Sequence, residues 1–229
     1  MGKRGQVTIY IVVAIAIVAV VVLVYLFYPQ IKIITSGELN PTSFLQTRIE
    51  TPVENGVKTL SSQGGYAEPE GFIQYQGNEV KYLCYSSEYY LPCKVQQPMI
   101  KQHFEKELEK LIEDDVKEAF QELKEQYERR GYEVSSSNLI KTKVEIIPEK
   151  IKVKIDSPLS VTKETSQTYD DFELEFPSQM YFLLMTATSI IDYEATYGDS
   201  ETSLYIQYYP NLIIEKNKLG DGSKIYNVR

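Results

Sequence analysis

Residues 141–162 read KTKVEIIPEKIKVKIDSPLSVT, and this stretch decides the fold. Lysines alternate with Val and Ile in both halves, and a period of two is typical of strands with one buried and one solvated face. Pro148 separates the halves, as expected for a turn between antiparallel strands. Residues 170–176, DDFELEF, repeat the alternation with acids. We therefore predict a sheet of at least three strands, antiparallel or mixed.

Amphipathic helices are predicted on both sides of this stretch. Residues 98–130 carry an apolar stripe at helical spacing with Lys and Glu on the other face, and Gly131 is suited to end the helix. Residues 42–63 predict another helix, with a kink at Pro52. A further packing helix is expected over 178–198. The predicted stripes are Leu45, Ile49, Val53, Val57 and Leu60; Ile100, Phe104, Leu108, Leu111, Ile112, Val116, Ala119, Phe120, Leu123 and Tyr127; and Tyr181, Leu184, Ala187, Thr188, Ile191 and Ala195.

Shorter β segments complete the predicted domain. Residues 71–85, GFIQYQGNEVKYLCY, indicate a hairpin that turns at QGNE. SLYIQYY and NLIIEKN are expected to be strands, and GDGSKIYNVR a turn with a final strand. The fold class is therefore α+β, with helices packed on the sheet over residues 42–229. The domain is either a single unit or two lobes with a boundary near 131–138.

The N-terminal region predicts a membrane anchor. Residues 7–28 contain no charge and are dominated by Val, Ile and Ala, and about 20 such residues span a bilayer core. Lys3 and Arg4 precede the run, which places the N-terminus in the cytoplasm by the positive-inside rule. We predict a cytoplasmic tip at 1–6, a transmembrane helix at 7–28 and a linker at 29–41. The remaining domain is then extracellular.

The charge balance excludes one class of partner. The 229 residues carry 24 Lys and Arg against 32 Asp and Glu, a formal net charge of −8. Every acidic residue lies beyond the apolar run, so the predicted extracellular part is more acidic than the whole chain. An acidic surface repels nucleic acid and anionic headgroups. We expect no nucleic-acid partner, and contact with the bilayer only through residues 7–28.

The chain has two cysteines, Cys84 and Cys93, in the sequence CYSSEYYLPC. Both fall outside the membrane by the topology above, where disulfides persist. A metal site would need further Cys or His ligands, and the chain has one His. The sequence therefore favours a disulfide that closes a short loop, with two free buried thiols as the alternative.

Tyrosine is the unusual feature of the composition, with 19 tyrosines and no Trp. Tyr offers a large contact area with a polar tip and is favoured at binding surfaces. Strands also favour Tyr for packing alone. The predicted interaction surface comprises Tyr82, Tyr85, Tyr89 and Tyr90, beside the cysteine pair.

Candidate catalytic and metal-binding residues are few. His103 is a lone histidine, and no nucleophile motif, phosphate-binding glycine loop or calcium loop accompanies it. The paired aspartates at 114–115 and 170–171 are explained by solvation. We therefore expect no catalytic residue, no metal and no cofactor, and the chain is predicted not to be an enzyme.

The sequence KRGQVT before the apolar run resembles the class III signal of archaeal type IV pilins. In that pattern a basic residue and Gly precede a Gln that becomes the mature N-terminus. The resemblance implies cleavage between Gly5 and Gln6, with the apolar helix retained for filament assembly. The chain departs from the pattern after the Gln, because Thr8 and Tyr10 occupy positions where Ser and Glu are expected.

A second resemblance spans most of the chain. LSSQGGY, the Tyr-rich hairpin, KIKVKIDSPLSV and YDDFELEFPSQMY, together with the N-terminus, resemble uncharacterised single-span surface proteins of small-genome archaea of the DPANN type. This resemblance implies a location at the cell surface and no particular activity.

The sequence thus gives three functional hypotheses. The first is a membrane-anchored, extracellular, non-enzymatic protein of cell-surface assembly or contact, with protein partners or self-association. The second is a pilin-like filament subunit processed before Gln6. The third is a membrane-tethered hydrolase whose site converges only in the folded chain.

Overall fold

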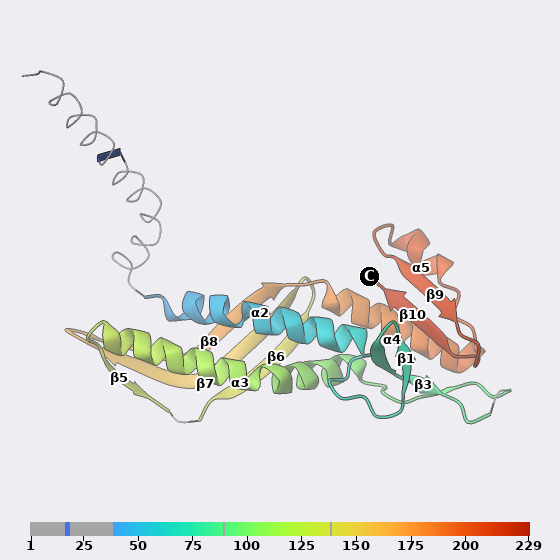
Figure 1. Ribbon diagram of the computed structural model, residues 1–229, viewed down its shortest axis with the longest axis horizontal. Coiled ribbons are helices and arrows are strands. Elements are labelled where there is room, and N and C mark those ends of the chain that lie inside the picture. Colours follow the sequence, from blue (N-terminus) through green and yellow to red (C-terminus); the bar gives the residue numbers. More distant parts are fainter. Residues whose placement is uncertain (1–16, 19–38, 89, 138) are drawn as a thin grey trace, which may run out of the picture. The chain divides into compact units, whose positions relative to one another are not determined.

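The computed structural model describes residues 17–18, 39–88, 90–137 and 139–229 (Figure 1). Residues 41–229 form one compact unit. The predicted cytoplasmic tip, the Gly5–Gln6 processing site and the predicted span lie outside the described residues, apart from Ile17 and Val18. Within the described part of the chain, no helix combines the length and the apolar character needed to cross a membrane.

A four-stranded antiparallel sheet is built around β7 (Lys150–Thr162). β8 (Ser166–Pro177) pairs along one edge of β7. β6 (Lys141–Ile147) and β5 (Glu133–Ser136) pair with successive segments of β7. The predicted α+β class and the three predicted strands are confirmed. β5 is an addition that the sequence analysis did not predict.

β7 contains a β-bulge, but the alternation of its buried side chains is not interrupted there. The register with β8 shifts between Asp156 and Leu159, where β7 holds one more residue than its partner. Pro158 lies inside this bulge, the position in a central strand that tolerates a missing N–H. Residues 151–161 still alternate between buried and more exposed side chains. One face of β7 therefore packs into the core along its whole length.

Two helices cover that face of the sheet, α2 (Pro41–Ser62) and α3 (Ile100–Arg129). The predicted stripes are confirmed, except that Val57 and Leu111 are half-buried. α2 continues through Pro52, and Gly56 is buried where the helices meet: a Cβ there would lie 2.6 Å from Leu108 Cδ1.

The charged side of α3 does more than the sequence analysis expected of a solvated face. The Ile146 N–H donates to Glu105 Oε1 at 2.7 Å, and the Val144 N–H donates to Glu109 Oε1 at 2.9 Å. Glu105 is buried and also pairs with Lys101 at 2.5 Å. These carboxylates satisfy β6 backbone groups that would otherwise form an open edge.

The C-terminal part comprises α4 (Met180–Tyr197), α5 (Ser203–Tyr208), β9 (Ile214–Lys218) and β10 (Lys224–Val228). The strands predicted in NLIIEKN and at the end of the chain are confirmed as β9 and β10, which pair antiparallel. α4 is confirmed, but its predicted face is wrong because only Leu184 of the predicted stripe is fully buried. The buried residues of α4 are Met180, Leu184, Thr186, Ile190 and Glu194.

The predicted strand at 203–209 is wrong, since residues 203–208 form α5. Helical spacing lets Tyr205 and Tyr209 both contact α4: the Tyr205 hydroxyl lies 2.8 Å from Ser189 Oγ, and the Tyr209 ring lies 4.8 Å from Phe182. The Tyr209 N–H also donates to the Tyr205 carbonyl, which is the hydrogen bond of a helical turn. Tertiary packing therefore overrides the β propensity of Tyr and Ile here.

The Tyr-rich hairpin is confirmed but shorter than predicted. β1 (Phe72–Tyr75) and β2 (Asn78–Lys81) pair through a two-residue turn at 76–77. Gln76 (φ 49°) and Gly77 (φ 83°) both have positive φ, as expected for a tight hairpin turn. β2 ends at Lys81, and the chain then starts a separate ladder.

Candidate functional site

The second ladder is closed by a disulfide. β3 (Cys84–Tyr85) pairs antiparallel with β4 (Lys94–Val95), and Cys84 is bonded to Cys93. The predicted disulfide is therefore confirmed, and the alternative of two free thiols is wrong. We call residues 84–93 the disulfide loop. Both of its ends are fixed, because the bonded Cα atoms lie 5.3 Å apart.

Hydrogen bonds inside the disulfide loop restrict it further. Ser86 Oγ donates to the Glu88 carbonyl at 2.6 Å and accepts from the Glu88 N–H at 3.3 Å. The Leu91 N–H donates to the same carbonyl at 3.1 Å. Tyr90 is hydrogen-bonded to the Glu88 side chain, and this bond raises the pKa of the phenol. These bonds hold Ser86, Glu88 and Leu91 in place before any partner arrives, which lowers the entropic cost of binding.

The structure divides the predicted tyrosine surface. Tyr82 is half-buried, with its hydroxyl 3.5 Å from Ser223 Oγ, and its ring lies 5.9 Å from that of Tyr85. Tyr85 is 52% exposed and Tyr90 is 79% exposed. Tyr89 lies outside the described residues. Tyr82 therefore packs the start of the loop against the domain, whereas the side chains of Tyr85 and Tyr90 are exposed to solvent.

Sequence reasoning missed Leu91, which is 50% exposed beside Tyr90. A Leu next to a Tyr in a short loop carries no periodic signal, so only the fold shows that it faces solvent. Tyr90 and Leu91 together form an apolar tip on the disulfide loop.

A second apolar surface was also missed. Leu204, Tyr205, Tyr208 and Tyr209 of α5 and its C-terminal flank line an open hollow of about 380 Å³. No residue of α5 is buried, and Tyr208 is 77% exposed. We call these four residues the α5 hollow. The segment was misassigned as a strand, and a strand would not have placed Leu204 and Tyr208 one helical turn apart.

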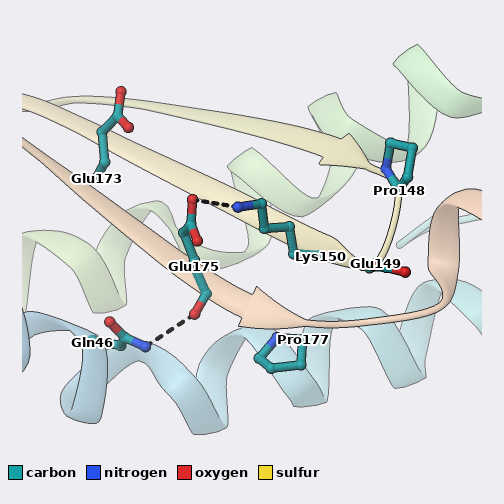
Figure 2. Close-up of a pocket in the computed structure, with 7 residues that line it drawn as sticks. All are labelled: Gln46, Pro148, Glu149, Lys150, Glu173, Glu175 and Pro177. Carbon is teal, nitrogen blue, oxygen red and sulfur yellow. Dashed lines mark hydrogen bonds and ion pairs between the residues drawn. The ribbon is translucent and has the colours of Figure 1, made fainter.

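A larger hollow, of about 600 Å³, lies at the edge of the sheet formed by β8, between Gln46 of α2 and solvent-facing side chains of β7 and β8 (Figure 2). Lys150 Nζ pairs with Glu175 Oε1 at 2.7 Å, and Gln46 donates to the Glu175 carbonyl at 3.0 Å. The bond from Lys150 lowers the pKa of Glu175. Since an acid catalyst needs a raised pKa, this carboxylate is unsuited to that role. The lining residues are Gln46, Pro148, Glu149, Lys150, Glu173, Glu175 and Pro177.

A buried carboxylate with three hydrogen-bond donors belongs to Glu194, which is 8% exposed. It accepts from the Ser200 N–H at 2.7 Å, from Lys224 Nζ at 2.8 Å and from the Tyr226 hydroxyl. Lys224 also pairs with Asp199 at 2.8 Å. We call these five residues the Glu194 cluster. It links the end of α4 to β10.

The ionisation of the Glu194 cluster indicates a structural role. Burial and the neighbouring Glu194 raise the pKa of Tyr226. Burial alone would lower the pKa of Lys224, but its bonds to Asp199 and Glu194 raise it overall. Bonds from Lys216 and Lys224 lower the pKa of Asp199. These three shifts favour neutral Tyr226, charged Lys224 and ionised Asp199, so none of these three side chains is tuned to exchange protons near neutral pH.

His103 packs against Tyr66, with ring centroids 4.0 Å apart. Burial lowers its pKa, and Nε2 is shielded from solvent without a hydrogen-bond partner. A nitrogen that a substrate cannot reach is not placed to act as a general base.

The paired aspartates remain at the surface. Asp114 lies 3.2 Å from Lys117, and Asp171 lies 2.6 Å from Lys154. In the part of the chain that the structure describes, no three His, Cys, Asp or Glu residues form a group suited to hold a metal.

Comparison of the chain with protein-family models, with curated proteins and with solved structures finds no match. The functional argument therefore depends on the surfaces of this chain alone.

Proposed function

We propose that this chain is a membrane-anchored, non-enzymatic protein of the cell surface whose domain 41–229 makes protein contacts through the disulfide loop. The observation that carries the proposal is the apolar tip: Tyr90 and Leu91 project into solvent from a loop fixed by the Cys84–Cys93 bond. Exposed aromatic and aliphatic side chains on a rigid support are typical of binding hot spots.

The proposed location depends on residues 1–28. The uncharged run 7–28 after Lys3 and Arg4 supports an anchor with its N-terminus in the cytoplasm. An extracellular position of residues 41–229 is consistent with the disulfide, since disulfides persist in oxidising compartments. The resemblance to archaeal single-span surface proteins supports the same location.

The test is capture from the native membrane. A photoreactive phenylalanine analogue replaces Tyr90 in the full chain, and a matched variant carries it at Glu118, an exposed position on α3. We expect irradiation to join position 90, and not position 118, to a protein of the cell surface. Equal labelling at both positions, or attachment to cytoplasmic proteins, would contradict the proposal.

The second candidate function is a pilin-like filament subunit, favoured by KRGQVT before the apolar run. Processing between Gly5 and Gln6 would leave residues 7–28 to pack in a filament core. N-terminal sequencing of the protein from its native membrane distinguishes the two functions. A start at Gln6 favours the filament subunit, whereas a start at Met1 or Gly2 favours the permanent anchor.

A further inference from the structure

The described surface outside the sheet is unevenly apolar. The exposed large apolar side chains beyond residue 40 gather on the disulfide loop, on α4 and around α5. Ten of the thirteen such side chains among the described residues beyond 40 lie there: Tyr85, Tyr90, Leu91, Tyr193, Tyr197, Leu204, Ile206, Tyr208, Tyr209 and Ile213. Such clustering marks a contact surface rather than the scattered apolar exposure of an ordinary monomer.

Within this region, one surface projects and another is concave. The disulfide loop carries Tyr90 and Leu91 at its tip, and the α5 hollow offers about 380 Å³ lined by one Leu and three Tyr side chains. Figure 1 shows the loop and α5 at the same end of the domain, on opposite sides of α4. α4 contacts β3, where the loop begins, and β4, which follows the loop, and the core beside Ile190 contacts Tyr205 of α5. With α4 between them, the two surfaces do not fill each other in one copy.

Charge narrows the choice of occupant. The chain carries a net charge of −8, so two copies repel each other at long range. The α5 hollow has no charged lining residue, and Glu88 is the loop's one charged residue. Contact between these surfaces brings two acidic chains together without apposing their charged faces. A basic partner would instead be drawn to the carboxylates elsewhere on the domain.

From this complementarity we infer that the occupant of the α5 hollow is the tip of the disulfide loop of a second copy of this chain. The contact is heterologous, because the loop of one copy meets the α5 hollow of the next. Each copy keeps one loop and one hollow free, so the contact can repeat head to tail. This inference rests on the proposed function, to which it adds the partner.

The first experiment maps the contact directly. Full chains labelled with ¹⁴N and ¹⁵N are mixed in detergent micelles, each with the photoreactive analogue at position 90. We expect mixed-isotope cross-links from position 90 to residues 204–209 of another copy. Cross-links within one copy only, links between two position-90 sites, or links to detergent alone would overturn the inference.

The second experiment tests directionality with two variants, one altered at the loop (Tyr90→Ser with Leu91→Ser) and one at the hollow (Leu204→Ser with Tyr208→Ser). All four side chains are at least 50% exposed, so folding should be preserved, as circular dichroism can check. Each variant alone should self-associate at least about tenfold more weakly by sedimentation velocity. An equimolar mixture should form dimers and nothing larger, because one working loop and one working hollow remain.

The matched control is Tyr197→Ser, which removes a side chain that is 71% exposed but does not line the α5 hollow. It should self-associate like the unaltered chain. Raising NaCl from 0.05 to 0.5 M should strengthen association, because salt screens the repulsion between acidic copies. Weakening by salt, or a mixture that stays monomeric, would overturn the inference.

The two proposals fail separately. If the hollow variant still yields a captured surface protein from position 90 while the unaltered chain stays monomeric in micelles, the inference fails and the proposed function stands. If position 90 captures no surface protein in the native membrane, the proposed function itself fails.

Discussion

Two regions of the surface differ in their side chains. The outer face of the sheet carries paired charges, whereas the end with α5 and the disulfide loop carries exposed apolar groups. On the sheet, Lys150, Lys152 and Lys154 pair with Glu175, Glu173 and Asp171 at 2.7, 3.1 and 2.6 Å. We call these three pairs the charge ladder. At the other region, Tyr90, Tyr208 and Leu204 have large apolar areas in contact with water.

This difference indicates which surface offers a partner the larger gain in binding free energy. Every lysine of the charge ladder already has a carboxylate, so a ligand would have to replace existing pairs. The apolar end has no such compensation, and covering it removes about 25 cal/mol of unfavourable hydration for each Å² of apolar surface. The side chains that the fold leaves exposed are therefore the ones that suit contact with another protein.

The largest expected effect comes from breaking the buried link beneath the apolar end. Glu194→Ala removes the carboxylate that accepts hydrogen bonds from the Ser200 N–H and from Lys224 Nζ in a buried site. We expect a loss of about 3 kcal/mol in the free energy of unfolding, as for other broken buried ion pairs. Urea denaturation measures this loss. Asp192→Ala, an exposed acid on the same helix, is the control and should change stability by less than about 0.5 kcal/mol.

A Glu194 variant as stable as the control would show that the cluster contributes nothing to holding β9 and β10. The apolar end would then be a loosely attached segment rather than a fixed contact surface.

The next effect tests the close approach between α2 and α3. Ala normally stabilises a helix relative to Gly by about 1 kcal/mol. At position 56 the new methyl would lie 2.6 Å from Leu108 Cδ1, and Leu108 is completely buried. We expect Gly56→Ala to lower the melting temperature, with a net loss of about 1–3 kcal/mol from overpacking.

Gly220→Ala is the matched substitution, since a Cβ there meets nothing within 4 Å. It should leave the melting temperature nearly unchanged. If Gly56→Ala were stabilising instead, α2 and α3 would be able to move apart at Gly56 to admit the methyl group. The layer of helices beneath the sheet would then be less rigid than its packing indicates.

The sequence predicted the elements whose pattern is local. The alternation in 141–162 and the stripe of α3 each record which side faces the core, so strands and helices could be assigned without the fold. β5 could not be found this way, because Glu133–Ser136 has little alternation and its pairing with β7 supplies the order. The helical state of 203–208 likewise depends on contacts with α4.

The candidate surfaces divide along the same line. Cys84 and Cys93 could be paired because the chain offers no other thiol. The buried role of Glu105 could not be foreseen, since a Glu on a charged helix face predicts solvation until the Ile146 N–H is placed beside it. The α5 hollow required the helical turn that sets Leu204 above Tyr208.

A smaller effect is expected in the pH dependence of stability. This dependence should come from His103, which packs in the interior, and not from the charge ladder. Burial lowers the pKa of His103 in the folded state, so the unfolded chain binds its proton at higher pH than the folded chain does. Stability should therefore fall as pH drops below about 6.5 and level off below the folded pKa. Glu107 and Lys110 on α3 act on the same ring in opposite directions. Urea denaturation at pH 7.5 and 5.0 measures the change.

His103→Gln removes the titration and should flatten the pH dependence between pH 7.5 and 5.0. Glu175 of the charge ladder should not contribute in this interval, because its bond from Lys150 holds the pKa of its carboxyl below the ordinary value. An unchanged slope in the Gln variant would assign the dependence to another group.

The smallest effect is expected on the charge ladder itself. Lys152 pairs with Glu173 at 3.1 Å, and the Glu173 side chain is 51% exposed, so water already solvates much of the pair. We expect Lys152→Met to change the free energy of unfolding by no more than about 0.5 kcal/mol, as for most exposed ion pairs. The double variant Lys152→Met with Glu173→Met should add no coupling larger than about 0.5 kcal/mol. A coupling above 2 kcal/mol would mean that the ladder holds the sheet together, and the contrast between a solvated charged face and an apolar contact end would no longer hold.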